Sequence, residues 1–353
     1  MVLSNEAIFM VLFIIFVITI LLVDLLLVGR NKEEVSLKEA GIWSFIWISL
    51  SLLFSLFLRF YGEIIHGIST PNELLDIVNK YSPELKLTGE TFAENLYQFR
   101  KFLSINYLTG YLIEETLSVD NLFVMLMILT AFNVKQSNYK RVLLWGILGA
   151  IILRFIFIFA GSALIQRFEW IMLIFGAYLI YTGISMFVKR HSEEKIDPQN
   201  NWLVKFLSKW VNVYPRYVEK NFFIRKDKKT FITPLLVVVL FIEFTDLIFA
   251  ADSIPAIFAV TKNPYIVFFS NIFAILGLRS LFFLLVHVVK IFYYLKTGIS
   301  FLLVFIGFKL LFHSWLDKIG YESVYSLYFI IIVLGLSIGF SLLKKKSDKL
   351  KIA

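Results

Sequence analysis

The sequence predicts an all-α polytopic membrane protein with about nine transmembrane helices, which include two inverted repeats of three helices each. Hydrophobic residues make up 59% of the 353 residues, and the chain contains 38 phenylalanines. Soluble domains contain only about 45–50% apolar residues, and the mean hydropathy here is +0.78. A membrane-spanning helix needs about 20 apolar residues in succession. Such runs lie near residues 6–28, 41–61, 107–132, 141–165, 168–188, 233–260, 264–289, 297–314 and 323–343.

These runs divide the chain into segments with different expected roles. The expected segments are two N-terminal transmembrane helices (1–61), an extracytoplasmic segment (62–106), a first three-helix repeat (107–188), a basic cytoplasmic loop (189–232), a second three-helix repeat (233–314), and a last transmembrane helix with a basic cytoplasmic tail (315–353).

The distribution of basic residues sets the expected orientation. The net charge of +9 would suit nucleic acid in a soluble protein, but Lys and Arg gather between the apolar runs, where the positive-inside rule accounts for them. This excludes nucleic acid as a partner and predicts a cytoplasmic C-terminus with the N-terminus outside. The chain contains no cysteine, which excludes disulfides, thiolate metal sites and thiol redox relays.

Two segments between the runs have recognisable patterns. In 62–106, Pro71 opens a helix-like stretch, which predicts a small amphipathic cap; an ion-collecting vestibule is the alternative. In 189–232, Trp202, Phe206 and Trp210 recur at four-residue spacing, which predicts an interfacial helix on the inner leaflet. A docking site for a partner is the alternative for that loop.

Carboxylates in the middle of apolar runs are the most informative feature of the chain. Glu114 and Asp120 are six residues apart, and so are Asp246 and Asp252. An acidic side chain at the centre of a membrane helix costs about 2.5–3.5 kcal/mol on insertion scales. Such residues therefore indicate a functional site.

The same spacing recurs with further matching residues. Gly146-Ile-Leu-Gly-Ala-Ile-Ile-Leu-Arg154 aligns with Asn271-Ile-Phe-Ala-Ile-Leu-Gly-Leu-Arg279, and Tyr181-Thr-Gly183 aligns with Phe305-Ile-Gly307. Because each unit has three spans and the loop between them starts and ends on one side, the second unit enters the membrane in the opposite sense. Inverted repeats of this kind build a substrate site at their interface, near the midplane. Arg154 and Arg279 are expected to pair with the acids or to gate the site.

The donor types favour a hard or intermediate divalent cation. Carboxylate, amide and carbonyl oxygens suit Mg²⁺, Mn²⁺ or Ca²⁺. On a regular helix, residues six apart point about 240° from each other, so each acid pair needs a bent helix to converge. Pro255 predicts a break in the second unit, with Asp252-Ser253-Ile254-Pro255 starting a new half-helix. The histidines His66, His191, His287 and His313 lie outside both motifs and are expected at surfaces or interfaces.

At these residues the chain resembles the TerC family of integral membrane proteins, and in particular its Alx-type branch. The resemblance rests on Leu117-Ser-Val-Asp120-Asn121, Leu148-Gly-Ala-Ile-Ile-Leu-Arg154 and the stretch from Glu243 to Thr261. It implies manganese export and metal homeostasis in the inner membrane of a bacterial cell. It also implies that Mn²⁺ is the transported substrate. We expect no tightly bound cofactor and no enzyme activity. Glu115 departs from the family, in which similar proteins often carry a basic residue.

The resulting hypothesis is a secondary transporter that exports Mn²⁺, with proton exchange as a possible coupling. Two alternatives are a membrane partner of the secretion machinery without transport activity, and a membrane-bound redox modulator. The partners considered are the divalent metal ion, membrane lipid, a second copy in a homodimer and the translocon. The expected site residues are Asp120 and Asp252 as first metal ligands, Glu114, Glu243 and Asp246 as further ligands or proton carriers, Asn121 as an oxygen ligand, and Arg154 and Arg279 as pairing or gating residues.

Overall fold

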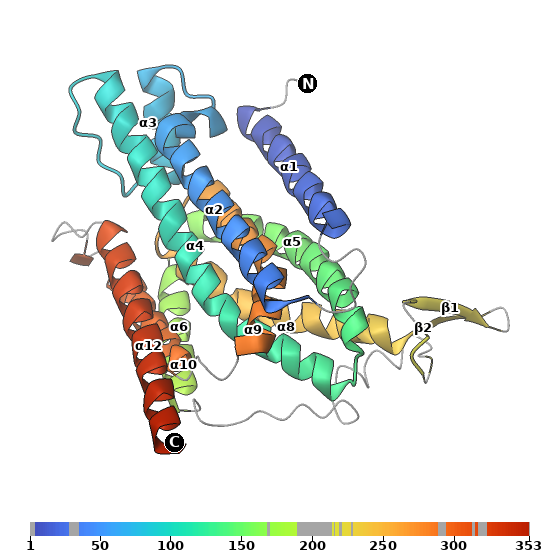
Figure 1. The fold of residues 1–353 in the computed structure, drawn as a ribbon. Coiled ribbons are helices and arrows are strands. Elements are labelled where there is room, and N and C mark those ends of the chain that lie inside the picture. Colours follow the sequence, from blue (N-terminus) through green and yellow to red (C-terminus); the bar gives the residue numbers. More distant parts are fainter. Residues whose placement is uncertain are drawn as a thin grey trace.

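A computed structural model shows a bundle made almost entirely of helices (Figure 1). It describes residues 4–27, 35–167, 170–188, 214, 216–218, 221–226, 229–288, 294–312, 315–316 and 323–352. The elements are α1 (Asn5–Leu27), α2 (Leu37–Tyr61), the 3₁₀ helix η1 (Gly62–Ile65), α3 (Pro71–Tyr81), α4 (Phe92–Ala131), α5 (Gln136–Arg167), α6 (Ile171–Val188), β1 (Phe223–Lys226), β2 (Lys229–Ile232), α8 (Pro234–Phe258), α9 (Pro264–Val288), α10 (Leu295–Leu311) and α12 (Ser323–Ile352).

Each apolar run expected from the sequence coincides with a helix. Within the described ranges, six helices are long and apolar enough to cross a membrane: α1, α2, α5, α8, α9 and α12. Helices α6 and α10 are apolar but have only 18 and 17 residues, and α4 contains the carboxylates at its centre. The chain is therefore a multi-pass membrane protein, and nine crossings remain a prediction.

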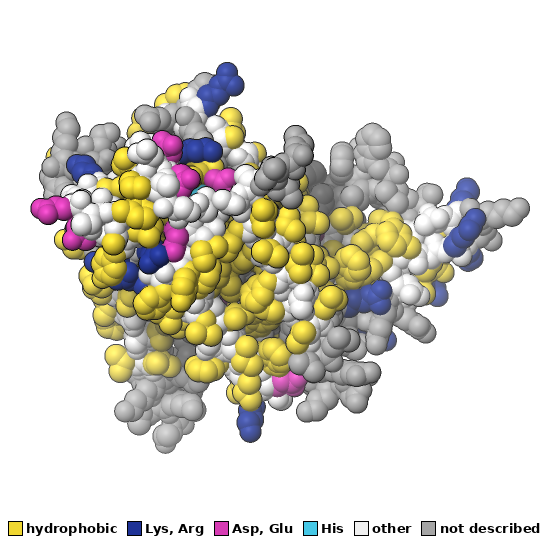
Figure 2. Space-filling view, turned by 90° about the horizontal axis from the view of Figure 1, so that it is seen from above, with side chains coloured by type: hydrophobic (Ala, Val, Ile, Leu, Met, Phe, Trp, Pro, Cys, Tyr) yellow, Lys and Arg dark blue, Asp and Glu magenta, His cyan; other side chains and the backbone are white. Residues whose placement is uncertain are grey.

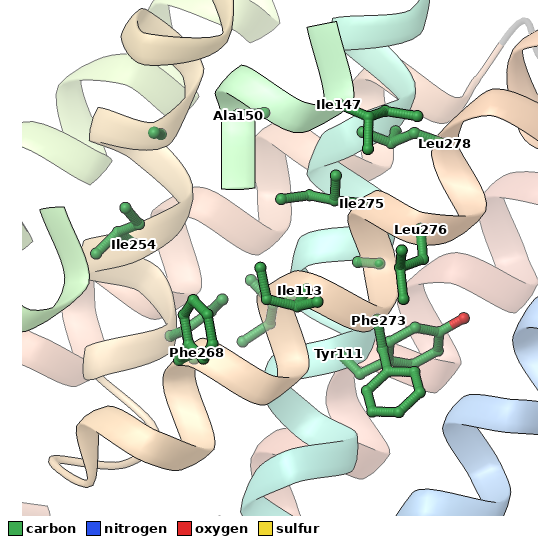
Figure 3. Close-up of a cluster of buried hydrophobic side chains, with 14 of the residues drawn as sticks. Tyr111, Ile113, Ile147, Ala150, Ile254, Phe268, Phe273, Ile275, Leu276 and Leu278 are labelled. Carbon is green, nitrogen blue, oxygen red and sulfur yellow. The ribbon is translucent and has the colours of Figure 1, made fainter. Parts of the chain in front are cut away.

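Helix α9 lies at the centre of the bundle. It is hydrophobic on all sides, as expected of a helix enclosed by others, and 89% of its membrane-spanning stretch is buried. It packs against α2, α4 and α5, while α4 also contacts α8 and α12, and α6 pairs with α10. Figure 3 shows Ile113 of α4, Ile147 of α5 and Ile275 of α9 in this core.

Phenylalanine rings connect the two N-terminal helices to α9. The ring centroids of Phe13 and Phe269 are 4.5 Å apart, and those of Phe54 and Phe273 are 4.9 Å apart. Aromatic pairs at such distances contribute about 0.5–1.5 kcal/mol each beyond their burial. These contacts explain part of the high phenylalanine content.

The segment 62–106 contains the helix expected after Pro71. Thr70 accepts a hydrogen bond from the Glu73 backbone N–H, and the Glu73 side chain accepts one from the Thr70 backbone N–H. This capping box fixes the start of α3. Leu74 and Val78 of α3 are buried while its other face is exposed, so the helix is an amphipathic cap.

The rest of this segment differs from expectation. A second capping box, between Thr91 and Glu94, starts α4 at Phe92, well before the membrane run expected from residue 107. The ion pair between Arg100 of α4 and Glu63 of η1 joins the extended helix to the cap. Helix α4 is therefore longer than a membrane span because its first part belongs to the cap.

A β-hairpin precedes α8 and was not expected. Strands β1 and β2 pair antiparallel, with Phe223 opposite Ile232 and Lys226 opposite Lys229. The hairpin projects from the bundle (Figure 1), and Figure 2 shows basic side chains at this end and acidic ones toward α3. The interfacial helix expected at Trp202, Phe206 and Trp210 lies outside the described residues.

Candidate metal-binding site

Helix α4 presents one polar face toward α5 and α8. Glu114, Ser118 and Asn121 are spaced by four and three residues, which places them on the same side of a regular helix. The helix is continuous from Phe92 to Ala131, so it has no break between the acids of the first repeat. A continuous helix is sufficient here, because Glu114 and Asn121 are seven positions apart and therefore lie on one face.

The predicted break in the second repeat is also wrong. Helix α8 continues through Pro255 and ends at Phe258, with Ala259 as its C-cap. Proline removes one backbone donor and crowds the preceding turn, but here less than one helical turn follows it. Asp252-Ser253-Ile254-Pro255 is thus the last part of α8 and not the start of a new half-helix.

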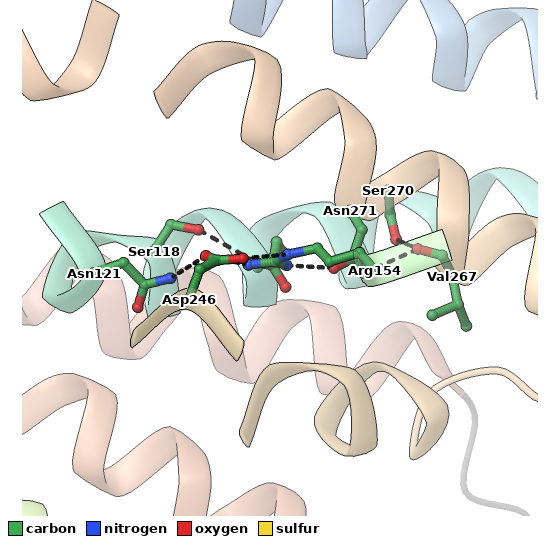
Figure 4. A network of polar contacts seen from close by, with 8 residues as sticks. Ser118, Asn121, Arg154, Asp246, Val267, Ser270 and Asn271 are labelled. Carbon is green, nitrogen blue, oxygen red and sulfur yellow. Dashed lines mark hydrogen bonds and ion pairs between the residues drawn. The ribbon is translucent and has the colours of Figure 1, made fainter. Parts of the chain in front are cut away.

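Arg154 of α5 is the centre of the site. Its side chain is fully buried and forms ion pairs with Glu114 of α4 and Asp246 of α8 (Figure 4). Its Nη2 lies 3.2 Å from Asp246 Oδ1, and its Nε lies 3.4 Å from Asp246 Oδ2. Its Nη1 also donates to Asn271 Oδ1 of α9 at 2.5 Å. One guanidinium therefore connects four helices.

Hydrogen bonds from neighbouring amides and hydroxyls orient these groups. Ser118 Oγ donates to Glu114 Oε1 at 3.3 Å, and Asn121 Nδ2 donates to Asp246 Oδ1 at 3.5 Å. Asn271 Nδ2 donates to the carbonyl of Val267 at 3.0 Å, which turns its Oδ1 toward Arg154. Buried ionic groups are tolerated when such hydrogen bonds satisfy their remaining atoms.

Two oxygen atoms of the site have no hydrogen-bond partner in the described part of the chain. Glu114 Oε2 and Asn121 Oδ1 are buried without a hydrogen bond. These are two acceptor atoms on residues that already surround Arg154. A buried acceptor without a donor is costly, and oxygen atoms of this kind are the ligands that hard divalent cations accept.

Glu243 and Glu115 lie outside the Arg154 cluster. Within the described residues, both carboxylate oxygens of Glu243 are buried without a hydrogen-bond partner. This side chain lies so close to Gly149 of α5 that a Cβ at Gly149 would overlap the Glu243 carboxylate. Glu115 Oε2 is likewise buried without a partner. Its Oε1 lies 3.9 Å from where a Cβ at Gly277 of α9 would be. Each of these two carboxyls therefore packs against a glycine of another helix.

The structure brings together only some of the expected site residues. Glu114, Asn121, Asp246 and Arg154 meet directly, whereas Glu243 forms no hydrogen bond with them in the described part of the chain. Arg279 is buried on α9. The described residues contain no group of three or more His, Asp or Glu side chains placed to hold a metal ion. The side chains of Asp120 and Asp252, the two expected first ligands, lie outside the described residues, so the predicted ligand set remains a prediction.

Two site features were not identified from the sequence. Asn271 was present in the aligned motifs, and its polar side chain within an apolar run was the signal that could have indicated a role. Gly149 gave no such signal because glycines are common in membrane helices.

His66, expected at a surface or interface, is instead buried between α1, α3 and α9.

The fold and the buried charge network define an integral membrane protein with an ionic site in its helical core. The model of the integral membrane protein TerC family matches residues 100–349, so the chain belongs to the TerC family. Its similarity to Alx proteins places it in the Alx-type branch.

Three relatives illustrate this similarity. A protein of Salmonella typhi named "Putative membrane-bound redox modulator Alx" is 42% identical over 300 residues, which cover 85% of this chain and 84% of the relative. The protein of the same name from Escherichia coli K12 is 41% identical with the same coverage. The uncharacterized membrane protein STKORF319 of Myxococcus xanthus is 40% identical over 95% of this chain and 92% of its own length. No solved structure matches the chain.

Proposed function

We propose that this protein is a secondary transporter that exports a divalent metal ion, with Mn²⁺ as the preferred substrate, across a bacterial inner membrane. We further propose that its N-terminus lies outside and its C-terminus in the cytoplasm. The observation that carries the proposal is the bridge formed by Arg154 between Glu114 of α4 and Asp246 of α8. These acids belong to the two proposed repeats.

The charge of this cluster supports a cation as substrate. Two carboxylates face one guanidinium, which leaves one negative charge when all three are ionised. The acceptor atoms without partners, Glu114 Oε2 and Asn121 Oδ1, are oxygens, and Mn²⁺ accepts carboxylate and carbonyl-type oxygen ligands. Asp120 and Asp252 are proposed to complete the ligand set. A metal ion binding here would compete with Arg154 for Glu114 and Asp246, so release of the arginine would accompany binding.

The contact between α6 and α10 supports the proposed inverted repeat. Gly183 of α6 lies against the Ser300 carbonyl and Val304 of α10, while Gly307 of α10 lies against the Gly176 carbonyl and Ile180 of α6. The two glycines are equivalent in the sequence alignment, and their contacts are reciprocal. In the same way, α4 packs on α9 and α8 packs on α5. Reciprocal packing is expected of two units related by a pseudo-two-fold axis, which can alternate access by rocking.

Glu243 is the proposed proton carrier. An isolated ionised carboxylate in an apolar interior is strongly unfavourable, and neither oxygen of Glu243 has a hydrogen-bond partner among the described residues. Binding a proton removes this cost. Exchange of protons for the metal ion would then use a carboxyl on the same helix as Asp246.

The name of the Alx relatives suggests a second candidate function, redox modulation. The chain contains no cysteine, so thiol chemistry cannot provide it, and a redox protein would need a bound cofactor visible in its absorption spectrum. A partner of the secretion machinery without transport activity is the third candidate. Such a partner would tolerate neutral replacement of the buried acids.

Uptake of Mn²⁺ into inside-out membrane vesicles tests the proposal. Asp246→Asn and Asp252→Asn remove a charge with little change of shape, and Asp76→Asn on the exposed face of α3 is the matched control. We expect accumulation with the wild type and with Asp76→Asn, and loss with both core variants at equal protein level. Absence of accumulation by the wild type across imposed pH gradients would refute export.

A further inference from the structure

An apolar groove between α10 and α12 lies apart from the ionic site. Its volume is about 800 Å³, within the range of about 300–1,000 Å³ typical of ligand pockets. Its walls are mainly aromatic and aliphatic, and they include Phe301 of α10 and Val333, Leu336 and Phe340 of α12. Phe301, Leu336 and Phe340 each expose more than half of their surface. The groove therefore opens on the outside of the bundle.

Small residues create the groove by holding the two helix backbones together at one side. A Cβ at Gly298 of α10 would lie 2.1 Å from Ser337 Oγ of α12, so the helices touch there. The Ser341 hydroxyl accepts a hydrogen bond from the Tyr294 backbone N–H at 2.9 Å. Beside this contact, aromatic and aliphatic side chains of both helices line the groove. The groove is thus built by fixed backbone positions.

The groove has a charged end. Lys344, the last residue of the α12 membrane span, lines it together with Tyr294, and the lysine Nζ lies 5.7 Å from the centre of the tyrosine ring. Lys345 and Lys346 follow in the sequence. An ammonium group binds phosphate as a point charge, and basic pockets between membrane helices bind anionic lipid head groups.

We propose that this groove binds one anionic phospholipid, with an acyl chain along Phe301, Val333 and Leu336 and the phosphate at Lys344. A lipid fits better than a second copy of the chain. Two copies related by a two-fold axis along the membrane normal would bring their Lys344 ends together in the same leaflet, and like charges repel. An anionic lipid places a negative charge there instead.

Native mass spectrometry of the full-length protein in detergent tests this site. The probes are phosphatidylglycerol, phosphatidylcholine with the same acyl chains, and a free fatty acid. Lys344→Gln removes the charge, Val333→Trp fills the groove, and Lys101→Gln on the exposed start of α4 is the matched control. One lysine near a phosphate gives about a fivefold preference.

We expect the wild type and Lys101→Gln to retain one phosphatidylglycerol with about a fivefold preference over phosphatidylcholine. Lys344→Gln should abolish the preference, and Val333→Trp should reduce binding of both lipids. Equal binding of the two lipids by the wild type, or an unchanged preference in Lys344→Gln, would overturn the proposal. Fatty acid binding as tight as that of phosphatidylglycerol would show that the phosphate head group is not recognised. A dimer that dissociates in Val333→Trp would assign the groove to a second copy of the chain. If Val333→Trp fails to fold, Lys344→Gln alone decides.

Discussion

Glu114 and Glu115 are neighbours on α4, yet their surroundings differ completely. Glu114 pairs with Arg154 and accepts a hydrogen bond from Ser118, whereas Glu115 packs toward Gly277 with a buried oxygen that has no partner. The same contrast occurs on α8, where Asp246 pairs with Arg154 and Glu243 packs against Gly149. A rotation of about 100° per residue along a helix separates a carboxylate paired with Arg154 from one that has, within the described residues, a buried oxygen without a hydrogen bond.

This contrast shows that burial alone does not define the role of a membrane carboxylate. A paired acid contributes to holding helices together, and removing its partner leaves a buried charge uncompensated. An acid without a partner costs stability when it is ionised, so its presence needs a functional reason. Substitutions that change only one kind of carboxylate can therefore separate structure from function.

Loss of the shared counterion should have the largest effect. Arg154→Gln leaves Glu114 and Asp246 facing each other in the core without a positive charge. Breaking a buried ion pair by removing one partner costs about 3–5 kcal/mol. We expect a large fall in the midpoint of thermal unfolding in detergent, or failure to insert.

Arg100→Gln is the matched control for this change. Arg100 pairs with Glu63 at the cap, where both side chains are partly exposed to solvent. Exposed pairs contribute about 0–1 kcal/mol, so this variant should be close to the wild type. Equal destabilisation by the two substitutions would show that Arg154 is not the centre of a buried network.

Replacement by glutamine should affect stability differently at Glu114 and at Glu115. Glu114→Gln removes a charge-assisted hydrogen bond that contributes about 1.5–3 kcal/mol, and it should lower the free energy of unfolding. Glu115→Gln changes a carboxyl whose Oε2 is buried without a hydrogen bond among the described residues, and it should leave stability unchanged or raised. Denaturation of both variants in one detergent measures the difference. Similar losses at the two positions would contradict the assigned pairing.

The sequence predicted much of this arrangement but not how the acids are divided between paired and unpaired. The apolar runs, the helix after Pro71 and the position of Glu114, Asp246 and Arg154 inside apolar helices followed from composition, capping pattern and insertion cost. The Pro255 break was wrong because a proline in the last turn of a helix disrupts little of it. Which acid faces Arg154 depends on the packing of α4 and α8 around α5. That packing is a tertiary property, and spacing within a single helix does not encode it.

The contact between Glu243 and Gly149 gives a smaller, sterically defined effect. Gly149→Ala would place its Cβ against the Glu243 carboxylate with too little space, so the carboxyl must move. Overpacking of this kind costs about 1–3 kcal/mol. We expect reduced stability and, if Glu243 carries protons, reduced metal accumulation.

A double substitution tests whether this cost arises from that one contact. Glu243→Ala makes room for the new methyl group, so adding Gly149→Ala to it should cost little. Residues in contact show interaction energies of about 0.5–3 kcal/mol in such cycles. Additive losses would place the effect of Gly149→Ala elsewhere in the interface between α5 and α8.

The smallest expected effect lies at the end of the bundle beside α3, at His66. This ring is buried, with Nδ1 3.3 Å from Glu6 Oε1 and Nε2 3.3 Å from Asn263 Nδ2, and it stacks on Tyr81. Burial lowers the pKa of His66 below its ordinary value of 6.5, with Lys80 acting in the same direction and Glu6 opposing it. The unfolded chain therefore binds more protons than the folded one just below pH 6.5.

It follows that the contribution of His66 to stability is complete above pH 6.5 and declines as the pH falls through that value. His66→Gln retains polar atoms for Glu6 and Asn263 but cannot titrate, so the midpoint of unfolding should change less between about pH 7 and pH 5 than in the wild type. Asn263→Ala, which removes one contact of the ring and leaves the imidazole, should retain the pH dependence. An identical slope in the wild type and in His66→Gln would assign the pH dependence to other groups, because only His66 loses its titration in that variant.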